Sequence, residues 1–198
     1  MLDFRQGPGH NCNNISHDLI FLIKSDIQSV TLCRWFYEEL IYGKLPYCGH
    51  QFIWLKEIWW IDGSLERENV NLLFSFVKQC CFLEELYVTI DPKCYNMTRR
   101  IRYSSRLITT GHKQLINFRL LKLEGFPNEM EEIVFARRFT PLFLERPDLE
   151  IMAKSSDGTN RWRHLVKVPK LETEGKYPYR FTEFENRGNP HHHVHMHI

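Results

Sequence analysis

A recurring apolar phrase, L-x-x-L-x-L, constrains this 198-residue chain more than any other feature of its sequence. Its first three copies begin at Ile27, Leu55 and Leu83, so the first two steps, meaning the intervals between the starts of successive copies, are equal. It returns at Phe118, and in degraded form at Leu149, after two longer steps. A repeat of this kind holds one strand and one helix, and one such unit cannot bury its own apolar residues. The spacing therefore predicts stacked units that share a sheet.

Alternation within each phrase predicts which residues enter the core. Successive strand residues point to opposite faces, so in LKEIWW the side chains of Ile58 and Trp60 share one face and those of Glu57 and Trp59 share the other. We expect an α/β fold, a short irregular leucine-rich-repeat solenoid with helices on its convex face. Its concave face would carry parallel strands in this spatial order: Ile27–Cys33, Leu55–Ile61, Leu83–Ile90 and Phe118–Glu124.

Helical patterns lie between the phrases. Glu66–Cys80 has apolar residues at helical spacing, and Glu129–Phe139 follows an Asn128/Glu131 pair with capping-box spacing and ends at Thr140-Pro141. Both helices should pack on the convex side. Two shorter helices are expected at Asp18–Lys24 and Trp35–Tyr42.

The pattern divides the chain into three parts. Residues 1–111 would be leucine-rich repeats, with a polar, basic insertion at 91–111. Residues 112–153 would be the final repeat, and residues 154–198 a C-terminal extension with one strand around Leu165–Val168 and a His-rich tail.

The stretches LKEIWWIDGSLERENVNLLFSFVKQCCFLEELYVTIDPKCYN and KQLINFRLLKLEGFPNEMEEIVFARRFTPLFLERPDLEIM resemble plant F-box/LRR proteins, the second stretch resembling their FBD segment. The tail phrase VKVPKLETEGKYPYRFTEFEN is similar to the ends of the same proteins, so the resemblance covers nearly the whole chain. The points shared with the FBD segment are Leu121, Leu123, Gly125, Phe126, Asn128, Glu129, Glu131 and Leu149.

The resemblance implies a substrate-recognition module of an SCF-type ubiquitin ligase. In such proteins an N-terminal F-box binds a Skp adaptor, and the repeats bind the protein to be ubiquitinated. Here no L-P-x-x-L-type helix precedes the repeats, and Leu2-Asp3-Phe4 already reads like a repeat strand, so we expect the chain to begin inside the array. The alternative is a truncated fragment without a ligase role that competes with full-length relatives.

The expected partner-binding site lies on the concave face, where solenoids commonly bind. Trp59 and Tyr87 occupy equivalent positions of successive repeats and would form an aromatic platform, with Glu57 and Glu85 as an acidic edge that favours a basic partner. The alternative is that a terminal segment covers Trp59. The complete expected set is Glu57, Trp59, Glu85, Tyr87, Lys122 and Glu124.

Motifs for catalysis, metals and cofactors are missing from the sequence. It has no P-loop, no Rossmann glycine pattern, no H-E-x-x-H and no G-x-S-x-G, so we expect no enzyme and no cofactor. The histidines from His191 to His197 are able to chelate a metal but read as an incidental tail. Basic residues of the insertion, Arg99 to Arg106 with Tyr95 and Tyr103, read as a solvated loop in preference to a nucleic-acid site, since the net charge is only +2.

Six cysteines without C-x-x-C spacing and an N-terminus without an apolar signal segment favour reduced thiols and a cytoplasmic or nuclear location. No run of apolar residues approaches the ~18 of a membrane span, so no membrane partner is expected.

The sequence predicts that this chain by itself does not bind a Skp adaptor, because it contains no F-box pattern. Size-exclusion chromatography of the chain mixed with purified adaptor should show two separate species. A stoichiometric complex would contradict the prediction.

Overall fold

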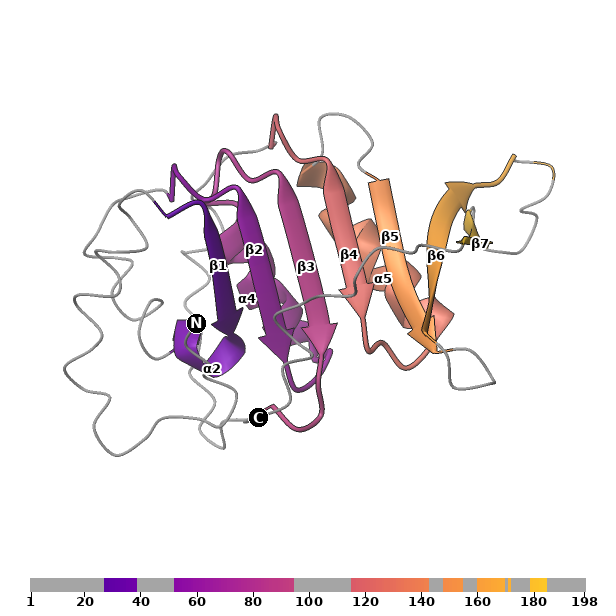
Figure 1. Ribbon diagram of the computed structural model, residues 1–198, viewed down its shortest axis with the longest axis horizontal. Helices are drawn as coiled ribbons and strands as arrows, with labels where there is room; N and C mark the ends of the chain where they lie inside the picture. The colour runs from indigo at the N-terminus through magenta and orange to yellow at the C-terminus, as the bar shows by residue number, and fades with distance from the viewer. Residues whose placement is uncertain are drawn as a thin grey trace.

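The computed structural model describes residues 27–38, 52–94, 115–142, 148–154, 160–169, 171 and 179–184. They form one seven-stranded sheet in which spatial order follows chain order (Figure 1). The strands are β1 Ser29–Cys33, β2 Glu57–Asp62, β3 Glu85–Ile90, β4 Leu120–Glu124, β5 Asp148–Lys154, β6 Asn160–Lys167 and β7 Tyr179–Phe184.

The first five strands are parallel, and their register repeats the spacing of the sequence. Ser29 pairs with Glu57 and Glu57 with Glu85, so each pairing joins equivalent positions of successive repeats. The predicted order and direction of the first four strands are confirmed, and the degraded copy at Leu149 forms β5 against β4. Strands β2 and β3 begin two residues after the predicted starts, because Leu55 and Leu83 are buried in the preceding turns.

Two helices cover one face of this sheet. Helix α4, Arg67–Val77, and helix α5, Glu129–Phe139, both lie behind the strands in Figure 1. As predicted, the Asn128 side chain caps α5, where its Oδ1 accepts from the backbone N–H of Glu131 at 3.0 Å. The helix passes into a short 3-10 turn, η5 Thr140–Leu142, where the Thr-Pro pair was expected to stop it.

The two shorter predicted helices have different outcomes. Helix α2, Arg34–Phe36, forms the start of the segment predicted as Trp35–Tyr42, directly after β1. The end of that segment and the whole of the predicted helix Asp18–Lys24 lie outside the described residues.

The hydrophobic core lies between the sheet and its helices. From the strands it takes the residues that alternation assigned to the inner face: Ile58, Trp60, Leu86, Val88, Leu121 and Leu123. From the helices it takes Leu72, Leu73, Phe76, Phe135, Ala136 and Phe139. Helices α4 and α5, which follow β2 and β4, are also joined directly: the centroids of the Phe74 and Phe139 rings are 5.6 Å apart, and Arg138 donates to Asn71. The two helices therefore pack on the sheet and on each other.

Beyond β5 the chain changes direction. Strand β6 is antiparallel to β5 and β7 is antiparallel to β6, so the sheet continues into what was predicted to be an extension. The predicted strand at Leu165–Val168 overlaps only the end of β6. A parallel repeat needs a long crossover, whereas an antiparallel pair needs only a short turn, so strands can continue the sheet after the repeat pattern fades. No helix among the described residues is both long and apolar enough to span a membrane.

Gly125 holds the end of β4 against β3. Its φ angle is +76°, in the left-handed region that favours glycine. A Cβ atom added there would lie 2.2 Å from the carbonyl oxygen of Ile90. The close approach therefore leaves no room for a side chain.

Asp62 ends β2 inside a buried polar cluster. Its side-chain oxygen Oδ1 lies 3.8 Å from Nε of Arg34, which is also 3.8 Å from Glu38. The backbone N–H of Ser64 and the side-chain amide of Asn69 donate to the same oxygen at 3.2 and 3.3 Å. Burial raises the pKa of Asp62 from 3.8 to about 6, although Arg34 and the hydrogen bonds oppose the shift.

Replacing Gly125 by alanine is expected to lower the free energy of unfolding by ~2–3 kcal/mol, because the new Cβ meets a backbone carbonyl and the backbone must adopt a strained φ. Urea denaturation of the two proteins measures the loss. An unchanged midpoint would show that the turn relaxes without cost.

Asp62→Asn should flatten the pH dependence of stability. Because the folded chain raises the pKa of Asp62, the group stabilises the fold below about pH 4 and loses that contribution as pH rises through about 6. From about pH 4 to about pH 7, the unfolding free energy of the unaltered chain should fall by ~2–3 kcal/mol relative to the variant. A difference between the two proteins that stays constant over this range would contradict the assignment.

Candidate protein-binding surface

The strand register brings four side-chain positions into one row across the sheet. Thr31 pairs with Trp59, Trp59 with Tyr87, and Tyr87 with Lys122. These positions alternate with the core residues of each strand, so they belong to the face opposite α4 and α5, which we call the front face (Figure 1). The structure thus places the aromatic pair on the face that the sequence predicted.

The Trp59 and Tyr87 rings are stacked. Their centroids are 3.9 Å apart and their planes differ by 1°. The ammonium group of Lys122 lies 5.7 Å from the Tyr87 centroid. Since Trp59, Tyr87 and Lys122 come from three successive strands, the Tyr87 ring lies between an indole and a cation.

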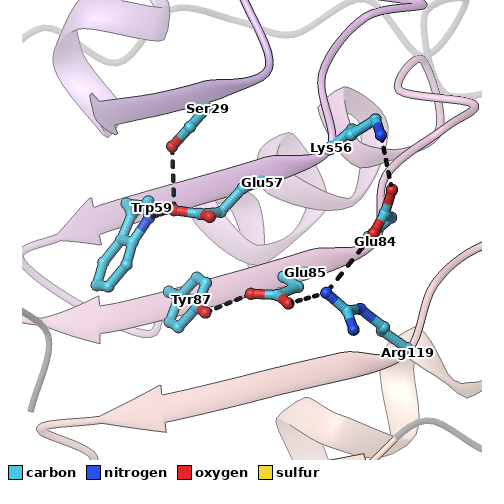
Figure 2. Close-up of polar contacts among 8 residues, drawn as sticks. All are labelled: Ser29, Lys56, Glu57, Trp59, Glu84, Glu85, Tyr87 and Arg119. Atoms are coloured by element: carbon cyan, nitrogen blue, oxygen red, sulfur yellow. Dashed lines mark hydrogen bonds and ion pairs between the residues drawn. The ribbon is translucent and has the colours of Figure 1, made fainter. Parts of the chain in front are cut away.

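Each ring is hydrogen-bonded to a carboxylate of its own strand. The indole N–H of Trp59 donates to Glu57, and the hydroxyl of Tyr87 donates to Glu85 (Figure 2). Residues two apart on a strand share a face, so the carboxylates form a second row beside the rings. The hydroxyl of Ser29 also donates to Glu57 at 3.0 Å. These bonds hold both rings in the orientation that stacks them.

Two cations offset the carboxylates at the N-terminal ends of the strands. Arg119 Nη2 lies 2.5 Å from an oxygen of Glu85 and 3.6 Å from one of Glu84. Lys56 Nζ lies 3.3 Å from the other oxygen of Glu84 (Figure 2). The acidic edge expected from Glu57 and Glu85 is therefore bonded to neighbouring donors, and Glu85 in particular is paired with a cation.

Sequence reasoning missed Lys56, Glu84 and Arg119 as parts of this surface. Lys56 and Glu84 are equivalent positions of successive repeats, so the repeat spacing carried a signal for that pair. Arg119 follows a longer and irregular step, and only the register of β4 shows that it lies beside Glu84.

The exposure of the rings differs from the expectation. Trp59 is only 8% exposed, although it lies outside the hydrophobic core cluster, while Tyr87 and Lys122 are half-buried. The stack with Tyr87 covers one face of the indole, so Trp59 is not the exposed anchor that the sequence suggested. The terminal segments named as an alternative cover lie outside the described residues.

Glu124 lies in a third row, on the opposite side of the ring row from the carboxylates. It pairs with Thr89 at the C-terminal end of β4, two residues beyond Lys122, and is half-buried. The six expected residues are thus all on described strands, in three adjoining rows of the front face.

Within the residues that the structure describes, no group of three or more histidine, cysteine or acidic side chains is arranged to hold a metal ion. Cys33, Cys80, Cys81 and Cys94 are thiols that take part in no disulfide within that part of the chain, and burial raises the pKa of the Cys80 thiol. The His-rich tail and the basic residues Arg99 to Arg106 lie outside the described residues.

Comparison with known proteins returns no matching family model, no matching curated protein and no matching solved structure. The case for a function therefore depends on the geometry of the front face and on the resemblance found in the sequence.

Proposed function

We propose that this chain is a protein–protein interaction module that binds its partner on the front face of the sheet. The observation that carries the proposal is the stacked Trp59–Tyr87 pair, held in register by bonds to Glu57 and Glu85. Tryptophan and tyrosine are enriched among the residues that contribute most to protein binding. A module of this kind needs no catalytic activity of its own.

The geometry of the pair supports binding because its rings are ordered before a partner arrives. Fixing a mobile side chain on binding costs ~0.5–1.5 kcal/mol, and rings that are already stacked and hydrogen-bonded avoid much of that cost. Tyr87 is the more accessible ring, so it would contact the partner while Trp59 supports it from the side. Lys122, on β4, would lie at the border of this contact.

The same proposal assigns the chain to a short leucine-rich-repeat solenoid. Support comes from the equal first steps of the repeat, from five parallel strands in chain order and from helices α4 and α5 on the same face of the sheet. The resemblance to plant F-box/LRR proteins then gives the partner a role: in full-length relatives it would be the protein presented to an SCF-type ubiquitin ligase.

The test is a comparison of two substitutions at Tyr87. Tyr87→Ala removes the stacked ring and should weaken partner binding by ~2 kcal/mol or more. Tyr87→Phe keeps the ring and removes the hydroxyl that donates to Glu85, so it should cost less than half as much. The partner is first purified by its binding to the unaltered chain and is then titrated against each variant by calorimetry.

Val134→Ser is the matched control, because Val134 is an exposed apolar residue on α5, behind the sheet. It should bind as the unaltered chain does. Thermal unfolding shows which variants remain folded, and Trp59→Ala is avoided because that ring is buried. A folded Tyr87→Ala variant with unchanged affinity would exclude the front face as the binding site.

A further inference from the structure

Exposed apolar side chains gather on the turns that precede β2, β3 and β4. Trp54 and Phe82, at equivalent positions of successive repeats, are 50% and 51% exposed. Ile53 and Ile116 on the same turns are 42% and 74% exposed. Clustered apolar exposure of this kind is typical of interaction sites and is costly without one.

Backbone hydrogen bonds align these turns. The N–H of Glu84 donates to the carbonyl of Lys56 at 2.7 Å, and the N–H of Arg119 donates to that of Glu84 at 2.8 Å. Trp54 and Phe82 each lie two residues before these aligned positions. A row of exposed apolar residues therefore lies beside the row of ion pairs, at the end of the sheet where β2, β3 and β4 begin. We call this end of the sheet the N-terminal edge.

The charges on this edge are unequally exposed. The side chains of Lys56 and Arg119 are 50% and 67% exposed, whereas those of Glu84 and Glu85 are 27% and 19% exposed. Within the described residues, Arg119 bonds through Nη2 alone, so these ion pairs leave its Nε and Nη1 donors unused. Either donor is able to form a charge-assisted hydrogen bond to a further carboxylate.

We propose that this edge, formed by Trp54, Lys56, Phe82, Ile116 and Arg119, is a second interaction surface for an acidic segment of a protein that also carries aromatic or aliphatic residues. A carboxylate would accept a hydrogen bond from Nε or Nη1 of Arg119, and the apolar residues would cover Trp54 and Phe82. Glu84 and Glu85 beside Arg119 would repel a continuous row of phosphates more strongly than a single carboxylate, because every phosphate adds negative charge. This surface borders the front face at Lys56 and Arg119, and the proposal does not depend on the function proposed for the stacked rings.

A random peptide library displayed on phage and selected on the purified chain tests the surface. Enriched peptides should combine acidic residues with tryptophan, phenylalanine or leucine. Synthetic copies should lose affinity by about tenfold or more on Phe82→Ser and on Arg119→Gln. Arg119→Lys keeps the charge but replaces the fixed donors of the guanidinium with one ammonium group, so it should recover only part of the affinity.

Val134→Ser removes an equally exposed apolar residue from α5 and should leave peptide affinity unchanged. Circular dichroism confirms that each variant is folded. Enrichment of basic peptides, no enrichment at all, or affinities indifferent to Phe82 and Arg119 would overturn the proposal. So would tighter binding of oligothymidylate than of any selected peptide, since that outcome would assign the edge to single-stranded nucleic acid.

Discussion

The parallel register of β2 and β3 is the constraint on which the rest of the structure depends. Pairing Ile58 with Leu86 and Trp60 with Val88 sends four apolar side chains into the core together. The same pairing puts Trp59 beside Tyr87 and Glu57 beside Glu85 on the other face. A shift of one residue in either strand would exchange its two faces, so burial of the core also fixes the front face.

That constraint has an electrostatic cost, because it places two carboxylates side by side on neighbouring strands. The structure offsets the repulsion with four donors, each from a different repeat: Ser29, Trp59, Tyr87 and Arg119. The donors to Glu57 and Glu85 are thus the groups that build the aromatic stack and its border. The same hydrogen bonds and ion pairs therefore orient the rings and neutralise the carboxylates.

The sequence predicted the parts of the fold that follow from periodicity. Strand order, helix positions and the face occupied by Trp59 and Tyr87 all follow from an equal repeat step and from the alternation of strand residues. The exposure of Trp59 did not follow, because alternation assigns a face and gives no information on what covers it. Arg119, most of β6 and the whole of β7 were missed because each depends on pairing across an irregular step.

The spatial order of the strands has a consequence for how the chain folds. Among the described residues, every strand pairs only with strands next to it in the sequence, so each pairing closes a loop no longer than about one repeat. Loop-closure entropy is then lost in small steps, and order is able to spread from any formed pair of strands to its neighbours in one dimension. In such a chain the pair β2 and β3, which shares both the core and the aromatic stack, is a natural place for that growth to begin.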